Sequence, residues 1–168
     1  MAKYEGKQWF TRHMETSTGL KNMNVNGSTA NKQYSVGPPP AGEVWNLWRA
    51  LVYIQDSGAF RAEGYGAASS TGLTNGLLLK VVGTTGNEVL DLLDGHPIKS
   101  NAGWALYCYD ADLKSWSVGD EMLVARWTFN NAGVPIVLSS TEKLQMTVRD
   151  NLTGLVEQSI VIQGNKDN

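Results

Sequence analysis

The sequence predicts an all-β protein, a jelly-roll-like β-sandwich by strand number, preceded by an extended N-terminal arm. Three observations lead to this prediction. Short apolar segments rich in β-branched and aromatic residues recur about 10–14 residues apart. Gly, Asn and Asp cluster between these segments, as they do in turns. No helical period stands out in the second half of the chain, and eight or nine strands are close to the number in a jelly roll.

Residues 1–37 form the predicted arm. Thr, Ser, Asn, Gly and Lys dominate this segment, and only Gln8–Met14 has the pattern of a short strand. Residues 1–36 carry five basic and two acidic residues, a net charge of +3, whereas the rest of the chain carries nine basic and fourteen acidic residues, net −5. A basic segment on an acidic body predicts a separate role in binding. The candidate contact residues are Lys3, Lys7, Trp9, Phe10, Arg12, Lys21 and Lys32.

The triplet Pro38-Pro39-Pro40 marks the boundary between the arm and the body, because consecutive prolines favour polyproline II geometry and lack backbone donors. We therefore place a β-sandwich domain at residues 38–164 and a polar tail at 165–168. The first element, Val44–Asp56, fits either a helix or a long strand. Its β-branched and aromatic residues favour a strand buried on both faces, with the helix as the alternative.

The next segments are shorter. We expect strands at Ala59–Tyr65, Leu77–Val82, Glu88–Leu93 and Trp104–Tyr109. The sequence Gly83-Thr84-Thr85-Gly86-Asn87 is a hairpin turn by composition, so the second and third of these strands should pair.

The most regular patterns follow. Residues 121–129 place Leu123, Ala125, Trp127 and Phe129 on one face, and Asn130–Gly133 predicts a hairpin into residues 134–138. Residues 143–149 alternate, with Leu144, Met146 and Val148 inward. In residues 156–162 we expect Val156, Ile160 and Ile162 to share a buried face.

We expect no catalytic residues, no metal site and no cofactor. His13 and His96 have no other ligand at metal-binding spacing, and Cys108 is the only cysteine. Asp110 and Asp112 could serve a calcium site or, as paired carboxylates, a glycosidase. Turn formation explains their position more simply.

Aromatic residues are the more informative set. Trp45, Trp48 and Trp127 fall inside predicted strands and are expected in the core. A second group flanks a polar turn. Packing in the core or a loop is the simpler explanation for it, and the alternative is that it stacks on sugar rings or anchors a protein interface. These possible surface contacts are Trp104, Tyr107, Tyr109 and Trp116.

Charge and hydropathy narrow the partners further. The net charge of −2 argues against general binding of nucleic acid. No apolar run approaches the ~20 residues that span a bilayer, so no membrane association is expected. The first residues lack the apolar core of a signal peptide, and we expect the protein to stay in the compartment where it is made.

Four segments carry a resemblance to a known group of proteins. They are Leu73-Thr74-Asn75-Gly76-Leu77, Pro97-Ile98-Lys99-Ser100-Asn101, Arg126-Trp127-Thr128-Phe129 and Val161-Ile162-Gln163-Gly164. Over residues 38–164 the chain resembles small structural proteins of tailed bacteriophage virions. In size and layout it is most similar to capsid decoration, or cement, proteins.

This resemblance implies a non-enzymatic protein, made in the bacterial cytoplasm, that binds the major capsid protein on the virion surface and stabilises the head. It also implies a jelly-roll-like fold and a homotrimer. The alternatives are a head–tail or tail structural protein, and a carbohydrate-binding module that recognises a receptor. We expect the arm to make the contacts, so removal of residues 1–36 should leave the body folded and weaken attachment.

Overall fold

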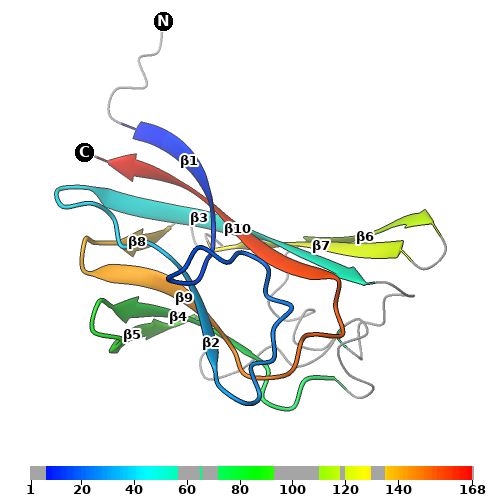
Figure 1. Ribbon diagram of the computed structural model, residues 1–168. Coiled ribbons are helices and arrows are strands. Elements are labelled where there is room, and N and C mark those ends of the chain that lie inside the picture. The colour runs from blue at the N-terminus through cyan, green and yellow to red at the C-terminus, as the bar shows by residue number, and fades with distance from the viewer. Residues whose placement is uncertain are drawn as a thin grey trace, which may run out of the picture.

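The computed structural model describes residues 7–56, 65, 72–92, 110–117, 120–129 and 135–167. In these residues the protein is all-β, with ten strands in two antiparallel sheets and no helix. Sheet A is the upper layer and sheet B the lower layer of Figure 1. The predicted fold class is confirmed at this level. The described part of the chain contains no helix of the length and apolarity needed to cross a membrane.

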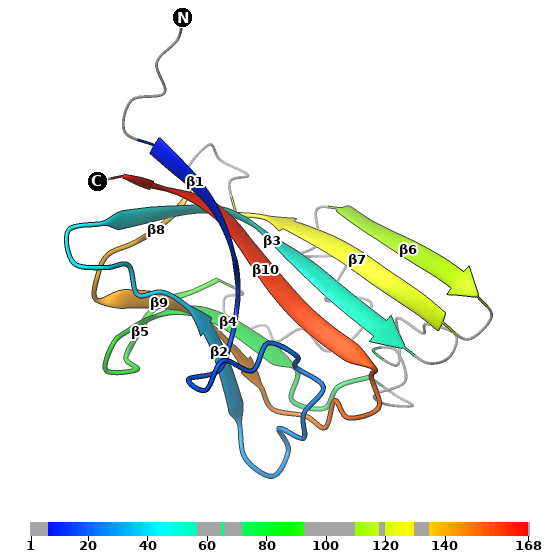
Figure 2. The same ribbon diagram turned by 45° about the horizontal axis from the view of Figure 1, so that its top comes forward.

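Sheet A has the strand order β1-β10-β3-β7-β6, and β8 also pairs with β3. The bounds of these strands are β1 Lys7–His13, β3 Val44–Asp56, β6 Asp110–Ser117, β7 Asp120–Thr128, β8 Ile136–Leu138 and β10 Glu157–Asp167. Figure 2 shows β1, β10, β3, β7 and β6 side by side in this order.

Sheet B has the order β2-β9-β4-β5. Its strands are β2 Lys32–Val36, β4 Leu77–Gly83, β5 Glu88–Asp91 and β9 Glu142–Val148. The predicted pairing of β4 with β5 around residues 83–87 is confirmed. The predicted inward face of β9 is confirmed as well, since Leu144, Met146 and Val148 are fully buried. The expectation that Gln145 points outward is wrong, because Gln145 is buried too.

Strand β3 matches its predicted bounds, so the helix alternative is wrong. The expectation that both faces are buried is also wrong, because buried and half-buried residues alternate along most of the strand. A β-bulge lies at Trp48: Gln163 pairs with Arg49, whereas Gly164 pairs with Leu47. Trp45 and Leu47 before the bulge, and Ala50 after it, all face the core. One extra residue reverses the parity of the pattern, which explains why no single period fits this segment.

Strand β7 is confirmed, and Trp127 is buried with Leu123 and Phe129 packed against the core. The hairpin predicted after it is wrong. Strands β7 and β8 do not pair with each other; both pair antiparallel with β3, at residues 49–56 and 45–47. They therefore run in the same direction along one edge of β3. In residues 156–162, Ile160 and Ile162 are buried as expected, but Val156 is 44% exposed because it precedes the strand.

An extended arm is not confirmed for the described part of residues 1–37. Strand β1 pairs with β10 over its whole length, and β2 pairs with β9, so each is the edge strand of one sheet. Glu15 and Ser35 form a bridge that joins the two sheets at this side, with N···O distances of 3.1 and 2.8 Å. This segment is thus part of the sandwich.

The residues between β1 and β2 are also held by the body. Met14 and Met23 are fully buried, and their backbone N–H groups donate to the carbonyls of Ile160 and Gln158 at 2.8 and 2.7 Å. Figure 1 shows this dark-blue segment crossing the side of the sandwich between the sheets. Met14 and Met23 thus close the core, which is the physical reason for their presence in a polar stretch, whereas Leu20 between them is exposed.

Some predicted segments are described only in part, and one lies outside the described residues. Of Ala59–Tyr65, only Tyr65 is described; it is fully buried with a φ of 53°. The strand predicted at Trp104–Tyr109 lies outside the described residues. Residues 165–167 of the predicted polar tail belong to strand β10, which continues to Asp167. Asn165 is 1% exposed, so this part of the segment is held in the fold.

Gly164 in β10 provides a test of the close contacts that β10 makes with β3 and β1 within sheet A. A Cβ atom at Gly164 would lie 2.5 Å from the carbonyl oxygen of Asn46 and 2.9 Å from Cζ of Phe10. We expect Gly164→Ala to lower the free energy of unfolding by about 2 kcal/mol, as overpacking does. The control is Gly83→Ala, whose Cβ would meet nothing closer than 3.7 Å. Equal midpoints of the two variants in urea would contradict this assignment.

Candidate functional site

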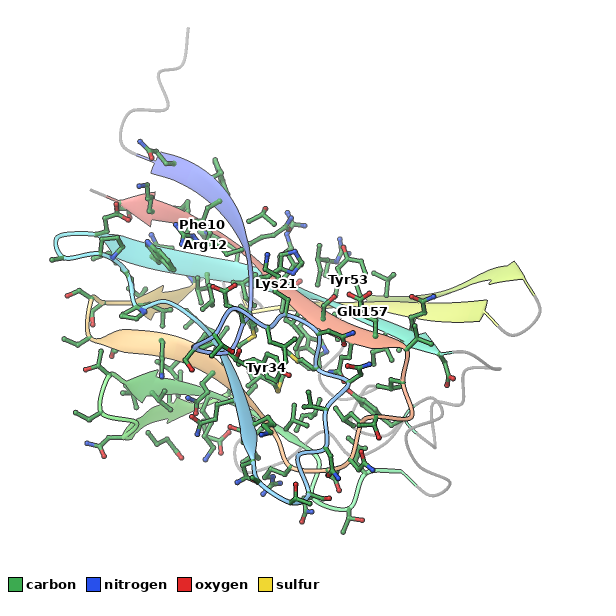
Figure 3. All side chains as sticks on the ribbon, viewed as in Figure 1. Phe10, Arg12, Lys21, Tyr34, Tyr53 and Glu157 are labelled. Atoms are coloured by element: carbon green, nitrogen blue, oxygen red, sulfur yellow. The ribbon has the colours of Figure 1, made fainter. Side chains whose placement is uncertain are left out.

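The candidate contact residues of the N-terminal segment lie on and beside β1. Lys7, Trp9, Phe10 and Arg12 belong to β1 itself. Lys21 follows in the connection to β2, and Lys32 begins β2. Lys3 lies outside the described residues. Figure 3 labels Phe10, Arg12 and Lys21 on this side of the sandwich.

Arg12 and Lys21 line a groove that we name the edge groove, because it lies between the edge strands of the two sheets. Its volume is about 350 Å³. Glu15 also lines it, so the Lys, Arg and Glu residues of the lining are two cations and one anion. The lining residues are Thr11, Arg12, His13, Glu15, Lys21, Ser35, Val36, Gly37, Pro38 and Trp45.

The guanidinium of Arg12 is held against aromatic rings. Its Cζ atom lies 4.5 Å from the ring centroid of Trp45 and 5.8 Å from that of Phe10. The two rings are themselves 4.9 Å apart and tilted by 48°. A cation over an aromatic face is attracted to its quadrupole. Phe10 is half-buried and packs against the core. These contacts hold the charge of Arg12 in a fixed position.

Glu43 completes this end of the sandwich. The indole Nε1 of Trp45 donates to Glu43 Oε2 at 3.1 Å, and Lys166 Nζ lies 2.9 Å from Glu43 Oε1. The hydrogen bond from Lys166, followed by that from Trp45, lowers the pKa of Glu43 below its ordinary value. Lys166 thus has a carboxylate partner. The charge of Arg12 also lowers the pKa of Glu43, and Arg12 lines the groove together with Lys21.

Lys21 and Lys32 are both exposed, but they are not neighbours. The edge groove includes Ser35 and Val36 at the end of β2, while Lys32 stands at the start of that strand. The structure therefore brings Arg12 and Lys21 together and leaves Lys32 apart.

Trp9 points the other way. It is 67% exposed and lines a second groove on the outer face of sheet A, together with Trp48 and Arg49. Trp48 is half-buried on this face, so the prediction that it belongs to the core is wrong. Successive residues of a strand point to opposite faces. This alternation could have separated Trp9 from its neighbours Phe10 and Arg12 in the sequence.

The second group of aromatic candidates lies almost entirely beyond what the structure describes. Trp104, Tyr107 and Tyr109 are outside the described residues, and so are His96 and Cys108. Trp116 belongs to β6, at a register shift between Ser115 and Ser117. The suggestion that these residues contact a sugar or a protein stays a prediction.

Among the described residues, no group of three or more His, Cys, Asp or Glu side chains is placed to hold a metal ion. Asp110 and Asp112 pair through their backbones with Arg126 and Val124 of β7. Two grooves beside β1 combine a cavity with charged and aromatic side chains.

No protein-family model matches this chain, and neither a curated protein nor a solved structure does.

Proposed function

We propose that this chain is a non-enzymatic structural protein of a tailed bacteriophage particle, which binds the major capsid protein and stabilises the head. The resemblance of four segments to small virion proteins is one support. The observation that carries the proposal is the edge groove, where Arg12 and Lys21 present positive charge beside two sheet edges. An acidic segment of a shell protein has the charge to fit it.

Attachment through this groove differs from attachment through an arm. Arg12 is already held over Trp45, and β1 is fixed by β10, so little ordering of this chain would accompany binding. Strand β1 ends the order of sheet A, and an extended partner segment could add to its outer edge. Many equivalent contacts on a symmetric shell allow each one to be weak.

The strand order supports a jelly roll as the finer fold. Strands β1, β3, β7 and β10 lie in sheet A, and β2, β4, β5 and β9 lie in sheet B. The chain changes sheet between β1 and β2, β2 and β3, β3 and β4, β5 and β6, β8 and β9, and β9 and β10. Alternation of this kind between two four-stranded sheets is typical of a jelly roll. On this proposal β6 and β8 are additions to it.

The proposal includes a homotrimer on the virion surface. Its first test is the number of copies in density-banded particles, measured by quantitative mass spectrometry. On the order of hundreds of copies per particle would support decoration of the shell. On the order of a few to a few dozen would favour a head–tail or tail protein instead. Absence from the particle would overturn the virion proposal.

A charge reversal tests the edge groove. We expect Lys21→Glu to weaken binding to bare capsids by about tenfold, since it places a carboxylate beside Glu15 where an acidic partner would bind. The matched control is Lys32→Glu, which makes the same change of charge at an exposed site outside the groove. Sedimentation with capsids over a range of protein concentrations measures both. Equal losses in the two variants would indicate a general charge effect and contradict a role for the groove.

A further inference from the structure

The second groove beside β1 has a different chemistry and shares one lining residue, Thr11, with the edge groove. We name it the outer groove; it lies on the outer face of sheet A and has a volume of about 240 Å³. It spans β1, β10 and β3, three neighbouring strands of the sheet. The lining residues are Trp9, Phe10, Thr11, Trp48, Arg49 and Gln163.

Strand register brings these residues together. Thr11 pairs with Gln163, and Gln163 pairs with Arg49, so these three form one row across the strands. Trp9 pairs with Asn165 in the next row on the same face. The bulge places Trp48 directly before Arg49, at the groove. The site is therefore built on sheet positions, which hold side chains more accurately than loops do.

The indole of Trp48 is fixed in place by a partly buried polar network. Its Nε1 donates to Asn165 Oδ1 at 2.6 Å. Asn165 is 1% exposed and donates in turn to Asp167 Oδ1 at 3.3 Å, while Asn46 donates to Asp167 Oδ2 at 2.8 Å. Trp48 thus presents a fixed aromatic surface at the groove. Trp9 leaves 67% of its surface to solvent, which core packing does not explain.

We propose that the outer groove binds one sugar ring of a glycan. The C–H groups of a pyranose form an apolar face that packs on an indole, and its hydroxyls lie around the rim of the ring. The rim of this groove offers the Thr11 hydroxyl, the Gln163 amide and the Arg49 guanidinium as donors and acceptors. Arg49 adds a positive charge, which favours sugars that carry a carboxylate.

The size of the groove favours a sugar over a peptide. Its volume is below the roughly 300–1,000 Å³ of sites that enclose a drug-sized ligand. The groove offers polar side chains to a ligand, namely those of Thr11, Arg49 and Gln163. A peptide would instead bind by pairing with a strand edge, and of the strands that line this groove only β1 is an edge strand. Capsid attachment, as proposed above, uses Arg12 and Lys21, which do not line the outer groove. The two grooves share Thr11, so each proposal is tested at residues that line only its own groove.

The test is binding of the full chain to an array of immobilised neutral and acidic glycans, followed by titration calorimetry with the best ligand. We expect Trp9→Ala and Arg49→Ala each to weaken binding by about tenfold or more. Both residues are exposed, so the fold should survive, and thermal unfolding checks this. The control is Val137→Ala, since Val137 is 51% exposed on β8 outside the groove.

An array without any bound glycan would overturn the proposal, as would a glycan whose affinity is unchanged in both groove variants. Capsid binding by the same variants separates the two functions. Loss of capsid binding in Trp9→Ala, with no glycan bound by the parent chain, would make the outer groove a protein contact. Glycan binding that survives Lys21→Glu and fails in Trp9→Ala would support the outer groove whatever the outcome for the capsid.

Discussion

Deletion of residues 1–36 is expected to leave a chain that does not fold. The deletion removes β1 and β2, the two edge strands next to β10 and β9. It also removes Met14, Met23 and Tyr34, which are all fully buried. Loss of one large buried side chain costs about 2–5 kcal/mol. Three such losses together with two strands exceed the roughly 5–15 kcal/mol that stabilises a typical domain.

The measurement is the thermal unfolding transition, followed by near-ultraviolet circular dichroism in the full and the shortened chain. The control is deletion of residues 1–6, which removes no residue of β1 and should leave the transition in place. A cooperative transition of the 1–36 deletion near that of the full chain would contradict the integration of this segment. It would restore the arm that the sequence alone predicts.

The arm was the natural prediction because the partners of this segment are distant in sequence. Strand β1 pairs with β10 at the other end of the chain, and no local pattern encodes such a pairing. The buried Met14, Met23 and Tyr34 are single apolar residues in a polar stretch, so they leave no period. Their isolation reflects a connection that crosses the core and contributes one side chain at a time.

Elements with a repeating pattern were predicted much better. The bounds of β3 and the inward face of β9 follow from the sequence, because each strand has neighbours on both sides and buries alternate residues. The bulge at Trp48 prevented a correct prediction of which residues of β3 face the core. A sequence pattern assumes a constant parity, and only the register with β10 reveals the extra residue.

The candidate site was predicted in part. Arg12 and Lys21 came from a charge count, and the structure places them in one groove. The count could not separate Lys32 from them, since separation in space depends on the course of the chain between β1 and β2. Trp9 and Phe10 are adjacent in sequence yet have opposite roles: Trp9 is exposed, while Phe10 packs on Trp45. Arg49 and Gln163 offered no signal until the sheet brought them together.

Asp150 is a buried carboxylate with a structural role in the loop before β4. It is 8% exposed, and its oxygens accept backbone N–H groups of Thr74 at 3.1 Å, Asn75 at 2.9 Å and Gly76 at 2.6 Å. The Asp150 carbonyl also accepts the N–H of Gly27 at 2.8 Å. A carboxylate that accepts several backbone donors is among the stronger hydrogen-bonding arrangements in proteins. Residues 73–77, which carry part of the resemblance, are thus ordered by this side chain.

We expect Asp150→Ala to lower the free energy of unfolding by about 3 kcal/mol, because three backbone donors lose their acceptor. Asp150→Asn should cost less, since the amide keeps one acceptor oxygen. It should still destabilise the fold, because its NH₂ group replaces the other acceptor and faces backbone donors. The control is Asn151→Ala: Asn151 is exposed and its Oδ1 accepts from Thr153 N at 3.1 Å, so its loss should cost below about 1 kcal/mol. Urea denaturation with a shared slope measures all three. If Asp150→Ala unfolds at the same urea concentration as Asn151→Ala, the carboxylate does not hold this loop, and the order of residues 73–77 must come from the packing of Leu73 and Leu77, which are both buried.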